Sequence, residues 1–351
     1  MTATSSPFSK RTLPAEWHRQ SCVQLTWPHE GTDWKPLLPE VTECYVSLAA
    51  EILRRESLIV VSPEPSAVLS LLRKRLPQAL LEGITTLQIP TDDTWARDHA
   101  FISVVDEEGS LRLLDFRFNG WGQKFPSSLD NLICRRMAEL GVPRGRYENQ
   151  QDFVLEGGSI ESDGKGTLLT TSRCLLSPNR NEPLGKEAIE LRLKSSLGAE
   201  RVLWLEHGAL EGDDTDGHID TLARFCPRDT IAYVQCLDQG DPHFPELSLM
   251  EQELRTLRTL SGEPYRLVPL PMALPERDKE GNRLPATYAN FLAVNGAVLL
   301  PSYGHAPQDN AAQLALQEAF PGREIVQVNS RVLLEQHGSL HCSAMQFPAT
   351  R

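Results

Sequence analysis

Residues 211–220, with the sequence EGDDTDGHID, place five acids, one histidine and two glycines within ten positions. A segment of this composition is either a charged surface loop or the wall of a pocket that binds a cation. His218 and Asp220 are two residues apart, and on an extended strand such side chains face the same side. We therefore expect both to point into one pocket, with Asp214 in the loop that enters the strand.

Five polar or reactive residues recur along the chain at similar intervals. They are Asp98, Glu156, His218, Asn290 and Cys342. The intervals are 58, 62, 72 and 52 residues, with an average of 61. Each residue lies just before or at the first strand of a predicted β unit. Because equivalent positions of repeated modules tend to converge in space, we expect these side chains to meet near one axis.

The elements that must position these residues follow a repeated order of helix, strand and hairpin. β-rich runs on either side of turn residues predict four hairpins: 100–105 with 111–116, 158–162 with 167–171, 218–225 with 230–236, and 290–294 with 297–301. Apolar spacing predicts six helices: 36–55, 65–81, 127–140, 183–197, 247–260 and 308–319. Further strands are expected at 58–61, 85–89 and 340–347, and 269–285 is expected to be a loop.

Five such units fill the 351 residues, and no Pro/Gly/Ser-rich linker divides them, so we expect a single domain over residues 1–351. The formal charge of −12 and the absence of a basic run argue against nucleic acid as a partner. No apolar run approaches the ~20 residues of a membrane helix, and the N-terminus lacks the apolar core of a secretion signal. We expect a cytoplasmic protein without membrane contact. The sequence leaves the oligomeric state open.

The chemistry of the five residues favours a thiol nucleophile over a metal site. One histidine among acids is too few for an ordinary zinc site, and DDTDGHID lacks the length and the terminal Glu of a calcium loop. The seven cysteines are odd in number and include no C-x-x-C pair, which argues against disulfides and a thiolate zinc site. We therefore expect neither metal nor cofactor.

A thiol and an imidazole among several carboxylates form an unusual nucleophilic site. The carboxylates would raise the pKa of the thiol and stabilise a cationic reacting group. A guanidinium is the natural candidate, because it is permanently charged and its five N–H donors match carboxylates in pairs. The pattern therefore predicts attack on the carbon of a guanidinium.

Six motifs extend this interpretation to a family. They are DDTWARDHAF, FNGWGQK, LEGGSIESDGKGTLLTT, CLLSPNRN, DDTDGHID and SLHC. In this order, and from about Trp27 to Phe347, the chain resembles the agmatine deiminase and bacterial peptidylarginine deiminase family of the guanidine-modifying superfamily. The resemblance implies an α/β fold, a five-module α/β propeller (pentein) with pseudo-fivefold symmetry.

The same resemblance implies the catalytic roles. Cys342 would be the nucleophile, and His218 the general acid and then the general base. Asp98 and Asp220 would each hold the guanidinium by paired hydrogen bonds. Glu156 would orient His218 and help to hold the cation.

Four further residues are implied in substrate binding. Trp95 would pack along the aliphatic stem, and Asp214 would meet the distal amine of agmatine. Asn290 matches a polar site residue of the peptidylarginine branch, and Gly338 matches the last glycine of the loop before the nucleophile.

This loop departs from the family pattern, because Gln336 and His337 replace two glycines and Ser339 replaces an asparagine. Trp121 is given no catalytic role, since a core aromatic is the commoner use. For Asp92 and Asp93, a local ion pair with Arg97 at a turn stays open.

The implied reaction is the hydrolysis of agmatine to N-carbamoylputrescine and ammonia through a covalent amidino-thioether, a step of putrescine biosynthesis and polyamine metabolism. Three alternatives stay open. Free or peptidyl arginine would give citrulline, an amine acceptor in place of water would make the enzyme an amidinotransferase, and a pocket without turnover would be a cation-binding module. Asp213 and Asp214 favour agmatine, because an arginine substrate needs a cationic partner for its carboxylate.

Overall fold

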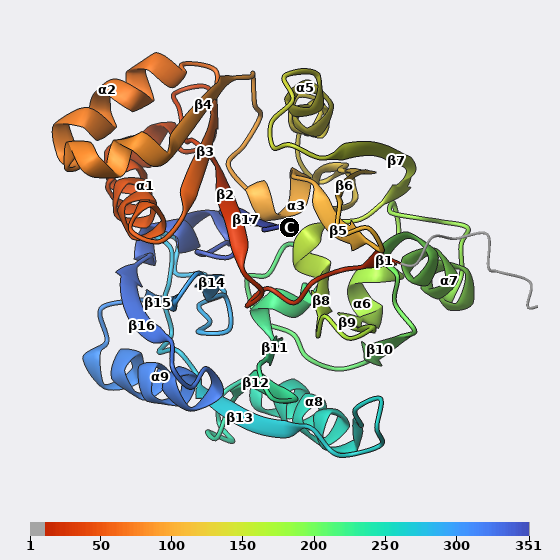
Figure 1. Ribbon diagram of the computed structural model, residues 1–351. Helices are drawn as coiled ribbons and strands as arrows, with labels where there is room; N and C mark the ends of the chain where they lie inside the picture. Colours follow the sequence, from red (N-terminus) through yellow and green to blue (C-terminus); the bar gives the residue numbers. More distant parts are fainter. Residues whose placement is uncertain (1–10, 351) are drawn as a thin grey trace, which may run out of the picture.

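The computed structural model describes residues 11–350, whose strands form five separate sheets (Figure 1). In neighbour order these sheets are β1 (Arg11–Thr12), β5 (Ile102–Asp106), β6 (Leu111–Arg117) and β7 (Arg146–Val154); β10 (Arg201–Leu205), β9 (Thr167–Thr171) and β8 (Ile160–Ser162); β11 (Ala223–Cys226), β12 (Thr230–Gln235) and β13 (Arg266–Pro271); β14 (Leu292–Val294), β15 (Ala297–Ser302) and β16 (Glu324–Asn329); β17 (Ala344–Pro348), β2 (Gln20–Thr26), β3 (Ser57–Ser62) and β4 (Ile84–Gln88). Figure 1 shows the sheets around a common centre, with the longer helices on the periphery.

All five sheets share one pairing pattern. Each contains an antiparallel pair, β5–β6, β8–β9, β11–β12, β14–β15 or β17–β2. A parallel strand then joins the second member of each pair. Parallel pairing needs a long crossover connection, which explains the helices between these strands. The four predicted hairpins are thereby confirmed.

The helices match the six predicted segments, with shorter bounds in most cases. They are α1 (Leu38–Leu53), α2 (Pro65–Arg75), α5 (Ile133–Glu139), α7 (Lys186–Leu197), α8 (Phe244–Thr256) and α9 (Ala306–Ala319). Short helices are α3 (Ala96–His99), α4 (Gly120–Gln123) and α6 (Ser172–Leu175), with 3₁₀ turns η1 (Lys35–Leu37), η2 (Gln78–Gly83), η3 (Asp130–Leu132), η4 (Gly157–Ser159), η5 (Ile219–Thr221) and η6 (Arg331–Gln336). Helix α2 stops early because Leu76, which precedes Pro77, is extended.

Helix α1 illustrates how the sequence builds the core. Val41, Tyr45, Leu48 and Ile52 recur at intervals of three or four residues and are completely buried. This spacing places them on one helical face, which packs against β3 and β16. Full burial of such a side chain stabilises the fold by about 1.5–3 kcal/mol.

Two ends of the chain meet in one sheet. Strand β17, near the C-terminus, pairs antiparallel with β2, near the N-terminus, from Ala344 opposite Leu25 to Pro348 opposite Gln20. The turn that precedes β17 is therefore held next to β2. Within residues 11–350, no helix combines the length and apolar character that crossing a bilayer requires.

Three predictions about strands are wrong. The strand predicted at 340–347 begins only at Ala344, and the strand predicted from 218 begins at Ala223. The predicted loop 269–285 overlaps the end of β13 at Pro271. The parallel strands β7, β10, β13 and β16, and also β2, were not predicted.

Candidate active site

Each of the five recurring residues lies a few positions before the first strand of one antiparallel pair. Asp98 precedes β5, Glu156 precedes β8, His218 precedes β11, Asn290 precedes β14 and Cys342 precedes β17. All five are nearly or completely buried. The contacts below show that the loops carrying them converge on one place.

Asn290 fixes the turn that carries Cys342. Its side-chain Oδ1 accepts hydrogen bonds from the backbone N–H groups of His341 and Cys342, at 2.9 and 3.2 Å. Its Nδ2 donates to Cys342 Sγ at 3.2 Å. The two captured N–H groups are unavailable to a strand ladder, which explains why residues 340–343 form a turn.

Asp98 and Asp220 flank the thiol but have different partners. Asp98 accepts hydrogen bonds from Gly158 N–H and Trp121 Nε1–H, both at 2.9 Å. Asp220 Oδ2 lies 2.7 Å from His341 Nδ1 and 3.8 Å from Cys342 Sγ. Asp220 Oδ1 is buried and has no hydrogen-bond partner among residues 11–350.

His218 and Asp220 do reach the same place, but not through strand alternation. Ile219–Thr221 is the 3₁₀ turn η5, because Thr215 Oγ1 accepts the N–H of His218 and the His218 carbonyl accepts the side chain of Thr221. These local bonds outcompete a strand. A Cβ atom added to Gly158 would lie 2.6 Å from His218 Nδ1 and 3.0 Å from Asp220 Oδ2, so both side chains crowd this glycine.

His218 is completely buried, and neither ring nitrogen has a hydrogen-bond partner among the described residues. Its Nδ1 lies 3.7 Å from Asp98 Oδ1. Burial alone would lower the pKa of His218, but neighbouring acidic groups, Asp98 first, outweigh it and raise the pKa well above the usual value. The raised pKa favours the protonated ring, whose nitrogens have no partner among residues 11–350 and can donate into the site.

Glu156 is held by Arg180. The Arg180 Nε–H lies 3.0 and 3.2 Å from the two Glu156 oxygens, and both side chains are fully buried. Arg180 also bonds Asp216 at 2.6 Å and the carbonyl of Thr215 at 2.8 Å, which ties Glu156 to the EGDDTDGHID segment. Glu156 lies within 4.8 Å of His218 but makes no hydrogen bond to it.

Trp121 contributes through an unusual backbone. Its φ of 55° and ψ of 50° place a non-glycine residue in the left-handed region, between two glycines with positive φ. Such conformations cost energy and persist where the surroundings enforce them. Here the loop aims the indole N–H at Asp98, a contact that the sequence analysis did not assign.

A cavity of about 210 Å³ opens over Cys342. Three aromatic residues, Trp95, Trp121 and Phe125, form part of its lining. Five acids also line it: Asp33, Asp93, Asp98, Asp214 and Glu335. The remainder is Thr215, Cys342 and the loop residues Gln336, His337 and Gly338. Trp95 lies directly against Gly338, where an added Cβ would come within 2.3 Å of the ring. The lining thus includes Trp95, Asp214 and Gly338, three of the four residues implied in substrate binding, and the fourth, Asn290, lies behind Cys342.

The electrostatics of the cavity disfavour a resting thiolate. Burial, reinforced by the charges of Asp220 and Asp98, raises the pKa of Cys342 well above its ordinary range. Burial also raises the pKa of Asp98. A cation bound between these carboxylates would reverse both effects, because it stabilises each anion. The arrangement suits a reaction in which a planar cation meets a thiol.

Two clusters have metal-ligating atoms within 4.8 Å of one another: Glu156, Cys174 and His218, and Glu16, Glu161 and His341. An arginine occupies each of them, since Arg180 bonds Glu156 and Arg224 bonds both Glu16 and Glu161. A guanidinium at hydrogen-bond distance opposes a divalent cation. These sets therefore suit internal ion pairs better than a metal.

A family model described as Porphyromonas-type peptidyl-arginine deiminase matches residues 12–348. The chain belongs to this family. Agmatine deiminase of Pseudomonas aeruginosa is 32% identical over 361 residues, which cover 97% of this chain and 96% of the relative.

Solved structures of the family also match this chain over nearly its whole length. A cysteine-to-serine variant of agmatine deiminase from C. jejuni, with substrate bound, has a TM-score of 0.90 and 36% identity and covers 99% of both chains. A Porphyromonas gingivalis structure provisionally named an arginine deiminase has a TM-score of 0.91 and 52% identity, with 97% of this chain and 98% of that chain covered. The mixed α/β architecture is thus that of the agmatine deiminases.

Sequence reasoning missed the charged residues behind the site. Arg180 lies in the motif CLLSPNRN and His341 in SLHC, so motif position pointed to both without suggesting a role. Arg224 and Glu16 carry no comparable signal. Asp92 and Asp93 form no ion pair with Arg97; their backbone N–H groups donate to Asp130.

We predict that the purified protein holds no structural metal, because both ligand clusters already contain an arginine. Elemental analysis should find well under one equivalent of any divalent metal per chain, and prolonged dialysis against a chelator should leave turnover unchanged. Turnover lost on dialysis and restored by one divalent ion would contradict this.

We predict that Gly158→Ala damages the site with little effect on the fold. Its new methyl would press on His218, Asp98 and Asp220, and displacements of about 1 Å at reacting groups can cost on the order of a hundredfold in rate. Gly185→Ala is the control, because its nearest added contact is 3.8 Å away. Parallel kcat/KM and Tm measurements check this; a Gly158→Ala protein as active as Gly185→Ala would refute it.

Proposed function

We propose that this protein is an agmatine deiminase, a hydrolase that converts agmatine and water to N-carbamoylputrescine and ammonia. One observation carries the proposal: the buried thiol of Cys342 lies beside carboxylates at the base of an acid-lined cavity, where burial and their charges raise its pKa. Such a thiol has no use for an anionic substrate, whereas a guanidinium activates it on binding. Membership in a deiminase family and the named relatives support the same reaction.

The guanidinium would bind between Asp98 and Asp220. Asp220 Oδ1 is the buried acceptor without a partner, and a guanidinium N–H supplies the missing donor. Asp98 keeps its two donors and adds a third. The bound cation lowers the pKa of Cys342, whose proton is released, and the thiolate attacks the central carbon at close range.

His218 would then act as acid and base. Its protonated ring gives a proton to the departing nitrogen, which leaves as ammonia and yields the amidino-thioether on Cys342. The neutral ring next deprotonates water, hydroxide attacks the same carbon, and the thiolate departs from the ureido product. Glu156 stands within 4.8 Å of the ring, where its charge stabilises the imidazolium.

The distal amine of agmatine would be bound at the acidic mouth of the cavity. Burial raises the pKa of Asp214 to about 6, so its carboxylate is largely ionised at neutral pH. Among residues 11–350, the cavity lining contains no lysine or arginine that would pair with the carboxylate of an arginine substrate. Lys124 lies outside this lining, with its Nζ on the Asp214 carbonyl and the Asp216 carboxylate. This favours agmatine over free or peptidyl arginine, and Trp95 is placed to pack along the four-carbon stem.

We also propose that residues 1–351 form one domain, a five-module propeller with pseudo-fivefold symmetry. The shared pairing pattern of the five sheets, and the recurrence of one site residue before each, support this arrangement.

We expect Cys342→Ala and Cys342→Ser to lose turnover of agmatine by at least a thousandfold, because Cys342 carries the one thiol in the cavity lining formed by the described residues. Assays of ureido product and ammonia with agmatine, arginine and a peptidyl arginine should rank agmatine first. Mass spectrometry of the quenched parent should place an amidino adduct on Cys342. An adduct on another cysteine, or a Cys342 variant within tenfold of the parent, would overturn the assignment.

We expect Asp214→Asn to weaken selection for the distal amine. A charge-assisted hydrogen bond is worth roughly 1.5–3 kcal/mol, so the preference for agmatine over butylguanidine should fall about ten- to a hundredfold. In the parent, this preference should decline as pH falls through about 6, since Asp214 then becomes protonated. The control is Asp33→Asn, because Asp33 is an exposed acid at the same cavity mouth. Equal losses in both variants would show that only the general charge of the mouth matters.

A further inference from the structure

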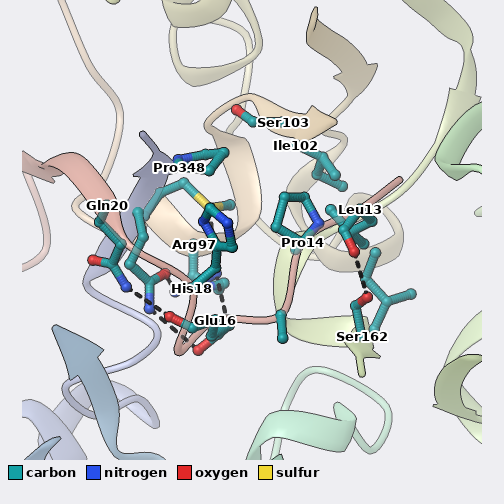
Figure 2. A pocket seen from close by; sticks show the side chains of 15 residues that line it. Leu13, Pro14, Glu16, His18, Gln20, Arg97, Ile102, Ser103, Ser162 and Pro348 are labelled. Carbon is teal, nitrogen blue, oxygen red and sulfur yellow. Dashed lines mark hydrogen bonds and ion pairs between the residues drawn. The ribbon is translucent and has the colours of Figure 1, made fainter. Parts of the chain in front are cut away.

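The segment between β1 and β2 carries Glu16 to the far side of the candidate site. Figure 2 shows Glu16 beside Arg97 and Gln20 at the wall of a second cavity. The volume of this cavity is about 70 Å³. Four side chains contact the one carboxylate of Glu16: Arg224 at 2.6 Å, His341 at 2.7 Å, Arg97 in an ion pair at 3.1 Å and Gln346 at 3.2 Å. The mechanism above uses none of these contacts.

His341 connects Glu16 to Asp220. Its Nε2 lies 2.7 Å from Glu16 Oε1 and its Nδ1 lies 2.7 Å from Asp220 Oδ2. Contacts this short are charge-assisted hydrogen bonds. The ring is completely buried between the two carboxylates, and Arg224 Nη2 lies 2.9 Å from its Nε2.

Arg224 anchors this chain of charges. Its guanidinium bonds Glu16 and Glu161 and donates to the backbone carbonyls of Ala289 and Phe291, at 3.0 and 2.8 Å. The side chain is almost completely buried. A buried arginine with every donor group engaged is rigid, so Glu16 and through it His341 are fixed in place.

Several charges face Asp220, and they oppose one another. On the side of the cavity, Asp98 repels its carboxylate and the Cys342 thiol is its near neighbour, while protonated His218 attracts it. From behind, His341 makes a hydrogen bond to it and Arg224 adds a more distant positive charge. Burial would raise the pKa of Asp220, but these cations, His341 first, lower it. Asp98, which has no such support, has a raised pKa.

We infer that Glu16 and His341 are positioning residues for the deimination, which hold the Asp220 carboxylate ionised and oriented before the substrate arrives. The inference rests on the proposed function. Glu16 holds the Nε2 side of the His341 ring, and the Nδ1 side makes the contact that is the first cause of the lowered pKa of Asp220. Neither residue touches the substrate.

The test compares Glu16→Gln with Glu161→Gln. Glu161 is the matched control, because it is buried on the same arginine but makes no hydrogen bond to His341 or Asp220. Glu16→Gln removes the carboxylate that holds the Nε2 side of the His341 ring, so the contact of His341 with Asp220 weakens and Asp220 becomes easier to protonate. An adjacent opposite charge lowers a carboxyl pKa by about 1–3 units. The acidic limb of kcat/KM for agmatine should therefore move up by about one pH unit in Glu16→Gln and stay in place in Glu161→Gln.

Variants of His341 separate charge from orientation. Asn can replace the Nδ1–H donor toward Asp220 without the charge, whereas Leu removes both. His341→Asn should reproduce the shift of Glu16→Gln, and His341→Leu should add a loss of roughly a hundredfold in kcat/KM at every pH. Glu16→Asp, with water in the adjoining cavity to bridge the gap, should restore most of the parent profile.

Binding distinguishes failure of this inference from failure of the proposed function. Calorimetry of agmatine with Cys342→Ala, alone and combined with Glu16→Gln or Glu161→Gln, reports Asp220 without turnover. As the pH is lowered, the affinity for agmatine should be lost at a higher pH in the Cys342→Ala, Glu16→Gln double variant than in Cys342→Ala alone or combined with Glu161→Gln. If the parent neither binds nor deiminates agmatine, the proposed function is wrong. If it does, and Glu16→Gln and Glu161→Gln have the same pH profile, Glu16 is merely structural.

Discussion

The structure depends on one electrostatic constraint, the convergence of Asp98 and Asp220 on the buried thiol of Cys342, with Glu156 close to His218. Like charges in a medium of low polarity repel strongly, and each needs a cation or hydrogen-bond donors. Glu156 has Arg180 and Asp220 has His341, whereas Asp98 has the neutral donors of Trp121 and Gly158 and lies 3.7 Å from His218 Nδ1. Asp220 Oδ1 has no hydrogen-bond partner among the described residues, and burial still raises the pKa of Asp98, so a further positive charge would stabilise both carboxylates beside Cys342. A guanidinium supplies the charge that the protein withholds.

The fold meets this constraint by giving each sheet one site residue and one supporting contact from elsewhere in the chain. Asn290 holds the Cys342 turn from the neighbouring sheet, and the backbone N–H of Arg97 donates to the Cys342 carbonyl at 3.1 Å. The pairing of β17 with β2 joins the two ends of this arrangement. It fixes the turn that carries Cys342 beside β2, the strand that follows Glu16. Fold and charge balance are thus set by the same loops.

The sequence predicted the hairpins and the converging residues because both are local signals: turn residues between β-rich runs, and one polar side chain before each. It failed where side chains captured backbone groups. Residues 340–343 alternate like a strand, yet Asn290 takes two of their N–H groups, and 218–222 turn because Thr215 and Thr221 bond the backbone of His218. The supporting charges were invisible for another reason. Glu16 and His341 are 325 residues apart, and only the closed fold shows that they touch.

The loop before Cys342 shows how this chain departs from its relatives without losing the site. His337 stands where the family pattern has glycine and adopts a left-handed conformation, with a φ of 64°, at a cost of roughly 1–2 kcal/mol. Its Nδ1 lies 2.6 Å from the carbonyl of Gly212, a hydrogen bond that offsets the strain and ties the loop to the segment that carries Asp214. The two walls of the cavity mouth are thereby joined. Gly338 stays a glycine, because an added Cβ would come within 2.3 Å of the Trp95 ring, so the family pattern is kept at this position between the changes at His337 and Ser339.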